Sequence, residues 1–297
     1  MRRLIVNADD FGLTRGVNRA IAELHRQRVL TSATLMANAS ATDDAIEIAL
    51  AVPSMGVGCH VVLVDGEPVL SAGRDIPHLA DASTGRFRPS LSSFLLWLHG
   101  PRSRFASSAV HAAEIEAEAA TQIASLQNRG LRLTHIDTHK HVHMFPSVLR
   151  PILRAARAAG ISVVRNPFEP AWSLHATSRA PWLRRKQVAF LGSLEPTFRR
   201  IVAEEGFTTT DGAIGVLATG TLDPATVQSL VRQLPPGTWE LVAHPGYNDA
   251  DLAQTSTRLM ESRETERKAL LALRQFPEIE LTSFAASVSS NKHLQPS

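Results

Sequence analysis

The sequence has a single cysteine, Cys59, and a single tyrosine among its 297 residues. One cysteine excludes an internal disulfide framework and a multi-cysteine zinc site. No run of about eighteen consecutive apolar residues is present, so no segment is predicted to span a membrane as a helix. The N-terminus lacks the apolar centre of a signal peptide and leads directly into a predicted strand. These absences predict a cytoplasmic protein.

A large excess of charge of one sign is also missing. The chain carries 31 basic and 28 acidic residues, which gives a net charge of only +3. That balance, together with the scarcity of aromatic stacking groups, argues against nucleic acid as a partner. Hydrophobic residues make up 44% of the chain, which is enough to build a sizeable core.

Strand-like apolar segments alternate with helical periodicity along most of the chain. This order is typical of an α/β fold with a parallel sheet and right-handed crossovers, and the length suits an irregular (β/α) barrel. We predict a single catalytic domain over residues 1–290 and a loose tail at 291–297. Strands are expected at 3–7, 32–36, 55–64, 131–136, 161–164, 213–217, 239–243 and 279–282, with helices between them.

Two segments interrupt the alternation, at about residues 65–106 and 166–206. The first is rich in Gly, Pro, Ser and Arg, and the second interleaves tryptophan and aliphatic residues with arginine and lysine. Long excursions that follow a strand often cover an active site, so we expect lid-like insertions. The basic and aromatic part, residues 172–200, also suits peripheral contact with an anionic membrane surface. A solvated lid helix remains the alternative.

Titratable residues stand where several predicted strands end, which is where barrels place their active sites. Asp9 and Asp10, followed by Phe11, end the first strand. Adjacent strand residues point to opposite faces, so both carboxylates can reach one site only if the chain turns there. Gly12 permits such a turn. One carboxylate would bind a metal and the other would take a proton, whereas capping of the next helix is the simpler alternative.

The densest polar motif follows the fourth predicted strand, with Asp137, His139, His141 and His143 spaced two apart. In an extended segment these side chains would point to one side. Imidazole and carboxylate are ligands that suit several divalent metals. We expect His139 to bind the metal, Asp137 to orient a ligand, and His141 and His143 to line the substrate cleft with Phe11. A polar loop with a chance histidine cluster is the alternative.

Three further strand ends carry His60, Arg165 and His244. His60 interrupts an apolar strand, so it is either a satisfied core histidine or a metal ligand, and its place before a turn favours the ligand. His244 precedes Pro245 and Gly246, and could donate a proton to a leaving group or simply end a strand.

The motifs at residues 7–12, at His60, at 134–146 and at 244–246 together resemble the YdjC-like carbohydrate deacetylases, a group that includes the chitooligosaccharide (diacetylchitobiose) deacetylases. The resemblance runs in order from Arg3 to about Phe284. It implies a distorted barrel that holds one divalent metal, with Mg or Zn expected, through an aspartate and two histidines. Carried over by position, it implies the following roles: metal ligands Asp10, His60 and His139, catalytic base Asp9, acid His244, and Arg165 holding the base.

The resemblance implies hydrolysis of the acetamide of an N-acetylated amino sugar, with release of acetate. The second insertion looks like the hopanoid-biosynthesis-associated branch of the group. That likeness implies an N-acetylglucosaminyl lipid as the substrate, and a location peripheral to the inner membrane face, rather than a soluble oligosaccharide. A homodimer is compatible with the sequence. Two other classes stay open: a metal-dependent phosphoesterase or isomerase on the same barrel, and a non-catalytic carbohydrate- or lipid-binding protein.

Overall fold

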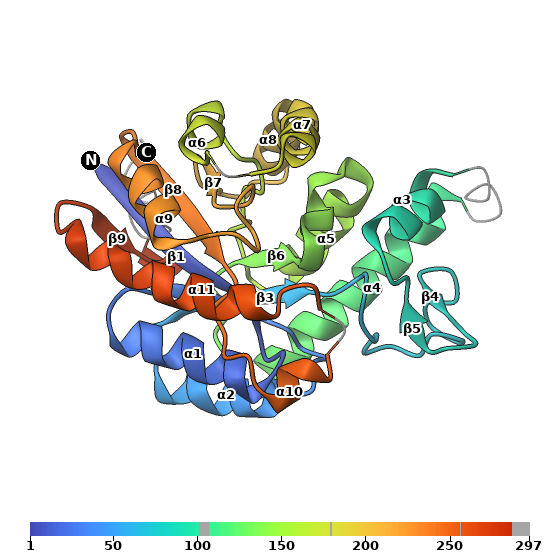
Figure 1. Cartoon of the computed structure of the whole chain (residues 1–297). Coiled ribbons are helices and arrows are strands. Elements are labelled where there is room, and N and C mark those ends of the chain that lie inside the picture. The colour runs from blue at the N-terminus through green and yellow to red at the C-terminus, as the bar shows by residue number, and fades with distance from the viewer. Residues whose placement is uncertain (101–106, 179, 256, 287–297) are drawn as a thin grey trace, which may run out of the picture.

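The computed structural model describes residues 1–100, 107–178, 180–255 and 257–286. The tail predicted at 291–297 lies outside the described residues. The chain forms a mixed α/β fold around a curled parallel sheet (Figure 1). The sheet has the order β6-β3-β2-β1-β8-β7, with β9 paired to β1. Its strands are β1 (Arg2–Phe11), β2 (Ser32–Leu35), β3 (Gly56–Val61), β6 (Ile136–Thr138), β7 (Gly212–Ile214), β8 (Gly237–Ala243) and β9 (Glu280–Thr282).

The sheet curls into a half-barrel, and isolated bridges continue it beyond β6 among the described residues. Ile136 of β6 bridges to Val164, and Val163 bridges to Thr208, shortly before β7. A regular strand was predicted over 161–164, and the structure has only these single pairings there. The strand predicted over 131–136 likewise reduces to the three residues of β6. Strand periodicity alone therefore predicted longer strands near residues 131–136 and 161–164 than the structure has.

Helices cover the outside of the sheet, and the apolar faces of both layers form one large core. The α-helices are α1 (Arg15–Arg26), α2 (Thr42–Ala51), α3 (Leu91–His99), α4 (Ser108–Gln127), α5 (Pro146–Ala158), α6 (Ala171–Ala176), α7 (Trp182–Leu191), α8 (Glu195–Glu204), α9 (Pro224–Arg232), α10 (Ala250–Ala253) and α11 (Glu261–Leu270). Among the described residues, none of these helices is long and apolar enough to cross a membrane.

The central strand β1 is buried along nearly its whole length, since it lies between β8 and two further strands. Its first half pairs with β9 and its second half with β2, while β8 follows it from Arg2 to Ala8. All of these pairings are parallel, so the carboxyl ends of the strands meet at one edge. The polar residues that follow the strands are thereby brought together.

The first insertion is anchored firmly to α4 by a row of polar side chains on one helical face. Glu114 accepts hydrogen bonds from the backbone N–H groups of His78 and Leu79. One turn further on, Glu118 accepts from Val69 and Leu70. Both carboxylates are buried, and buried backbone donors are costly to leave unpaired. The described part of this insertion is therefore a fixed wall beside the strand ends.

Candidate active site

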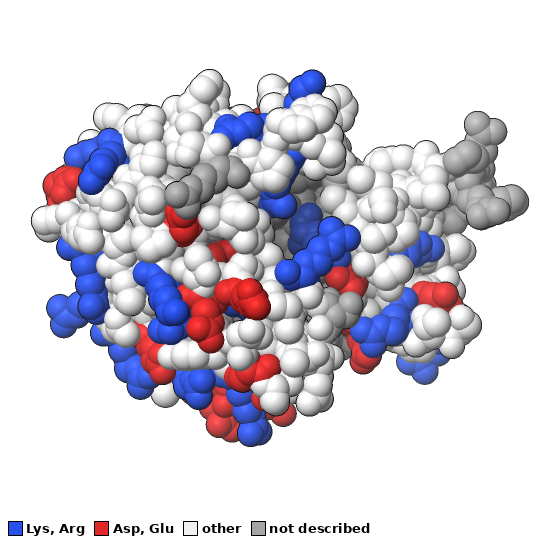
Figure 2. All heavy atoms as spheres, viewed as in Figure 1, with Lys and Arg blue, Asp and Glu red and all other residues white. Residues whose placement is uncertain are grey.

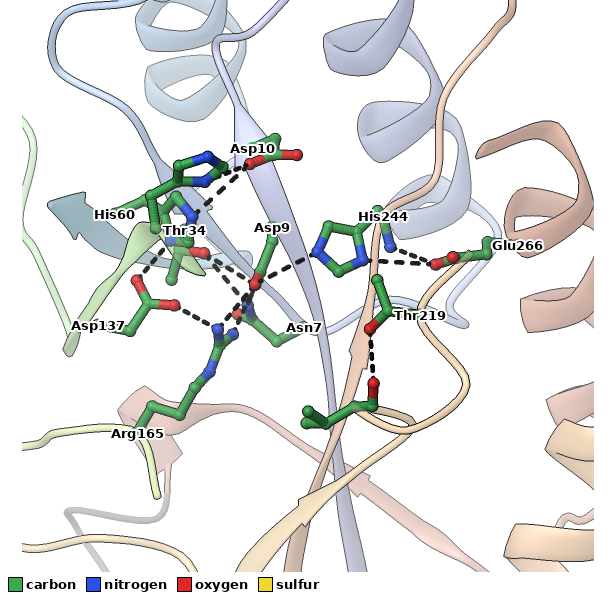
Figure 3. Close-up of polar contacts among 12 residues, drawn as sticks. Asn7, Asp9, Asp10, Thr34, His60, Asp137, Arg165, Thr219, His244 and Glu266 are labelled. Atoms are coloured by element: carbon green, nitrogen blue, oxygen red, sulfur yellow. Dashed lines mark hydrogen bonds and ion pairs between the residues drawn. The ribbon is translucent and has the colours of Figure 1, made fainter. Parts of the chain in front are cut away.

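Asp9 and Asp10 both reach the same site because the chain turns at Asp10 itself. Asp10 has a left-handed backbone with φ 62°, and Gly12 follows with φ 99°. The β1–β2 register is shifted between Ala8 and Phe11, which marks the same irregularity. The two side chains are almost fully buried and point to opposite sides of the strand end (Figure 3). The turn expected from the sequence is confirmed.

Asp10, His60 and His139 form a cluster at the carboxyl edge of the sheet. Asp10 Oδ1 lies 3.6 Å from His60 Nε2 and 3.4 Å from His139 Nδ1. One ligand atom from each residue lies within 4.8 Å of the others. His60 comes from β3, and His139 begins the short 3₁₀ helix η2 (His139–Met144) directly after β6. Residues from three parts of the chain thus converge on one point.

Asp137 and Arg263 fix the orientation of His60 and Asp10 within the cluster. Asp137 Oδ1 lies 2.7 Å from His60 Nδ1, which leaves Nε2 turned toward Asp10. Burial lowers the pKa of His60, but the carboxylates of Asp137, Asp9 and Asp10 together outweigh this effect and raise the pKa to about 9. Arg263 of α11 donates to Asp10 Oδ2 at 2.6 Å, so only Oδ1 is turned to the histidines. A carboxylate behind a histidine is the usual second layer of a metal site.

Asp9 faces away from the cluster into an ion-pair network. Its two oxygens accept hydrogen bonds from the guanidinium of Arg165 at 2.8 and 2.6 Å. Thr34 donates to the same carboxylate. Burial alone would raise the pKa of Asp9, but Arg165 holds it far below its usual range, so the side chain is ionised. Arg165 therefore keeps Asp9 ionised and able to accept a proton. The same low pKa makes Asp9 a weak base.

Arg165 is fully buried and contacts two more carboxylates, those of Asp137 and Glu240. Burial raises the pKa of Glu240 to about 7, against the lowering effect of Arg165. One guanidinium group thus pairs with three carboxylates, those of Asp9, Asp137 and Glu240.

His244 stands on the other side of Asp9, at the end of β8. Its Nε2 lies 3.8 Å from Asp9 Oδ2. The backbone N–H of His244 donates to Glu266 of α11 at 2.6 Å, and the same oxygen is 3.7 Å from His244 Nδ1. Burial lowers the pKa of His244, while Glu266 raises it enough to give a net increase. The imidazolium form is therefore favoured, as a proton donor requires.

The residues present fit a divalent cation at the Asp10 cluster. Asp10 Oδ1 is buried and has no hydrogen-bond partner among the described residues. Its other oxygen, Oδ2, is held by Arg263, so Oδ1 is the atom left free to bind a cation together with the two histidines. One carboxylate and two imidazoles suit Zn, Mn, Fe, Co or Ni. A second group, Asp9, His60 and Asp137, suits a metal less because Arg165 and His60 already occupy its carboxylates.

A comparison of the chain with models of protein families shows the family to which it belongs. The model of the family described as YdjC-like protein matches residues 3–276. The chain belongs to the YdjC-like family. The resemblance inferred from the motifs is thereby confirmed.

Several known proteins match over nearly the whole chain. A protein of Brevibacillus brevis named carbohydrate deacetylase is 35% identical over 95% of this chain and 98% of its own length. A protein of the same name from Oceanobacillus iheyensis is 30% identical over 93% of this chain and 98% of its own. A solved structure from Enterococcus faecalis, titled a putative cellobiose-phosphate cleavage protein, superposes with a TM-score of 0.70 at 24% identity, covering 96% of this chain and 98% of that one. This last likeness concerns the fold alone.

The three residues expected in the cleft of this YdjC-like protein differ in their exposure. Phe11 and His143 are fully buried, so neither has surface to offer to a substrate. His143 instead contacts Thr138 Oγ1 and the carbonyl of Arg165. His141 keeps partial exposure, and burial lowers its pKa to about 3. Residues 139–144 are not extended, because Lys140 and His141 adopt left-handed backbone angles and turn the chain into η2. The spacing of two therefore does not place these side chains on one side.

Sequence reasoning missed Glu240 and the two buried residues of α11, Arg263 and Glu266. The helix was expected, and a signal was present in it. Arg263 and Glu266 lie one turn apart on the face that also buries Ala269 and Leu270. Charged residues on an apolar helical face are seldom buried without a partner. The sequence could therefore have predicted that this pair faces a polar site. It could not have predicted which site.

Proposed function

We propose that this protein is a metal-dependent carbohydrate deacetylase that removes acetate from an N-acetylated amino sugar. The observation that carries the proposal is the arrangement of Asp9 and His244 beside the cluster of Asp10, His60 and His139. That arrangement provides a cation site, a proton acceptor and a proton donor within one buried site (Figure 3). The names of the similar Brevibacillus and Oceanobacillus proteins support the same reaction.

Asp10, His60 and His139 would hold the cation, and Asp137 and Arg263 would orient two of these ligands. A bound divalent cation supplies polarisation of the acetamide carbonyl and acidification of a water molecule. Asp9 accepts the proton of the attacking water at Oδ2, the oxygen that faces His244. Arg165 holds that carboxylate in place. His244 donates its proton to the leaving nitrogen, and Glu266 keeps the imidazole charged until then. The products are acetate and a free amino sugar.

The test is acetate release from a panel of N-acetylated sugars by protein whose metal content has been measured. Metal-stripped protein should be inactive, and activity should return with one equivalent of a divalent ion. The panel should include Zn, Mg, Mn, Co and Ni, since the ligand set does not select among them. Release of acetate by the metal-free protein would contradict the proposal. So would failure to release acetate from any sugar of the panel.

The phosphoesterase alternative is less well supported, because the buried arginines of the site are not free to bind a phosphate. Phosphoryl transfer commonly uses paired metals or an arginine or lysine clamp on the phosphate. Both buried guanidinium groups near the site are already bound to carboxylates, Arg165 to Asp9 and Arg263 to Asp10. A silent binding protein is also less well supported, because binding alone does not require an acceptor and a donor beside a cation. Metal-dependent acetate release separates the three classes.

A glycolipid substrate is a finer version of the proposal, and α7 supports it. None of the residues of this helix is buried, and Trp182 and Phe190 are 67% and 77% exposed. Arg184 and Arg185 bind backbone carbonyls of the protein, so the arginines point inward and the aromatic side chains outward. Such a helix suits peripheral contact with a lipid surface.

The glycolipid version is tested by co-sedimentation with anionic vesicles and by acetate release from lipid-linked N-acetylglucosamine. The Trp182→Ala, Phe190→Ala double variant should lose vesicle binding and keep its activity on a soluble sugar. Activity confined to soluble sugars, with no binding to vesicles, would contradict this version and leave the deacetylase intact.

A further inference from the structure

His139 is the member of the metal-ligand cluster that no side chain holds from behind. Asp137 fixes the ring of His60, and Arg263 fixes the carboxylate of Asp10. The ring of His139 has its Nδ1 3.4 Å from Asp10 Oδ1 and contacts no other hydrogen-bonding group among the described residues. Its other neighbour is the ring of His60, which it meets edge-on with the centroids 5.5 Å apart. Another part of the protein must therefore set the orientation of His139.

The backbone next to His139 has a direct effect on the position of its ligand atom. The nitrogen that faces Asp10 is Nδ1, which is bonded to Cγ and lies close to the backbone. His60 instead turns Nε2 toward the same carboxylate, at the far end of its ring. A change in the backbone at His139 therefore moves Nδ1 with it. A metal site requires its ligand atoms to be held closely in place, so this backbone matters for binding.

The two residues that follow His139 have an unfavourable backbone conformation. Lys140 has φ 56° and ψ 22°, and His141 has φ 53° and ψ 31°. Left-handed angles are disfavoured for residues with a Cβ, and they persist only where surrounding contacts hold them. On the inner side of the turn, the backbone N–H of His143 donates to Thr138 Oγ1 at 3.1 Å. This contact leaves the outer side of the turn to be held by another group.

Lys140 holds the outer side of the turn through an ion pair with the first insertion. Its ammonium donates to Asp65 Oδ2 at 2.6 Å. Asp65 follows β3 shortly and is itself fixed, because its backbone N–H donates to the carbonyl of Arg88 at 2.8 Å. The guanidinium of Arg88 in turn donates to the carbonyl of Leu79 at 2.7 Å. Lys140 is therefore bound to the part of the insertion that α4 anchors.

Water reaches this ion pair from one side. The side chains of Lys140 and Asp65 are 30% and 24% exposed, and Asp65 lines a cavity of about 760 Å³. Figure 2 shows this face of the molecule hollowed near its middle, with basic and acidic side chains at the border. Within the part of the chain that the structure describes, Asp65 is the only acceptor for this ammonium. Exposed ion pairs contribute little to the stability of a fold, so the effect of this pair is local.

We infer that Lys140 and Asp65 are positioning residues for His139, and that their ion pair holds the left-handed turn that directs Nδ1 toward Asp10. This inference rests on the metal site of the proposed function. Neither residue contacts the cluster or the reacting atoms. Loss of either partner frees the turn to relax toward more common backbone angles, so the cluster binds a divalent cation more weakly. The first insertion thereby supports the metal site through Asp65.

The test measures the Zn²⁺ affinity of the metal-stripped full chain by competition with a chelator. Lys140→Met removes the ammonium and keeps the apolar stem, and Asp65→Asn removes the charge with a residue that tolerates the left-handed backbone. Each variant should bind Zn²⁺ on the order of 10-fold more weakly, the lower end of the effect of groups that orient metal ligands. A purely electrostatic effect has the opposite sign for Lys140→Met, because removal of a nearby positive charge strengthens the binding of a cation.

A charge-reversed pair separates the ion pair from other effects of the substitutions. The double variant Lys140→Asp, Asp65→Lys rebuilds the pair in the opposite sense and should restore the affinity to within about threefold. Arg129→Met is the matched control, because it breaks the exposed pair with Asp43 of α2 and should leave Zn²⁺ affinity unchanged. Without metal, all variants should unfold at nearly the same urea concentration as the unchanged protein.

Unchanged Zn²⁺ affinity in either single variant would overturn the positioning role. Stronger binding by Lys140→Met, or a charge-reversed pair that fails to recover affinity, would overturn it as well. An unchanged protein that binds Zn²⁺ but releases acetate from no sugar would overturn the proposed deacetylase and leave the positioning role standing. An unchanged protein that binds no Zn²⁺ would overturn both.

Discussion

Replacement of Asp9 by asparagine should abolish turnover while the protein keeps its fold and its metal. The carboxylate of Asp9 accepts hydrogen bonds from Asn7, Thr34 and both terminal nitrogens of Arg165. An asparagine can keep the bonds to its carbonyl oxygen, but its amide nitrogen would face one N–H of Arg165 without an acceptor. The loss of one charged hydrogen bond costs about 1.5–3 kcal/mol.

The cost should lie at the lower end of that range, because Arg165 retains two other partners. Asp137 and Glu240 still neutralise it. Removal of the Asp9 charge also relieves repulsion, since Asp9 helps to raise the pKa of Glu240. A loss of about 1.5–2 kcal/mol is small beside the roughly 5–15 kcal/mol that stabilises a typical domain. The variant should therefore remain folded at ordinary temperatures.

The loss of the proton acceptor should lower kcat by about 10²–10⁴-fold. The assays are acetate release, metal content of the purified protein and urea denaturation, all on the same preparation. Asp43→Asn is the control, because Asp43 is an exposed acid on α2 whose partner is Arg129. Activity of Asp9→Asn within tenfold of the unchanged protein, with metal bound, would refute the assignment of Asp9 as the acceptor. Loss of metal together with activity would show that Asp9 acts on the metal site instead.

Three further changes test the surrounding groups. His139→Ala should lose both metal and activity, as measured by metal analysis and acetate release, and an active variant would remove His139 from the ligand set. In the metal-free protein, His60 paired with Asp137 has a pKa near 9, above its ordinary value of 6.5. The His60–Asp137 pair should therefore stabilise the metal-free fold fully below pH 6.5, and this contribution should be lost as the pH rises through about 9. Metal affinity should rise over the same pH window, because the cation displaces a proton from His60. Calorimetric titration with the metal in two buffers measures that proton release. Glu266→Gln should shift the alkaline limb of the kcat profile to lower pH, because Glu266 raises the pKa of His244, and an unmoved limb would contradict the role of His244 as the acid.

The order of elements and the positions of the polar strand ends could be predicted because both depend on local pattern. Alternating strands and helices imply a parallel sheet, and parallel strands place their carboxyl ends at one edge. The resemblance to the YdjC-like family implied Asp10, His60 and His139 as one ligand set, and one ligand atom of each lies within 4.8 Å of the others in the structure. The length of the strands near residues 131–164 was not predictable in the same way, because a curled sheet limits how many residues pair there.

The sequence by itself determined which chemical groups follow the strands, and hence which groups could meet. Only the tertiary structure decided how they are oriented. Arg263 reaches Asp10 across 253 positions of the chain, and Arg165 reaches Asp9 across 156. Such pairs depend on helix and strand packing, which no local pattern encodes. The left-handed turn at Lys140 and His141 also depends on contacts made elsewhere, because short-range preference disfavours it. Burial then sets the charge of each group, since removal from water shifts a pKa according to the partners that the fold supplies.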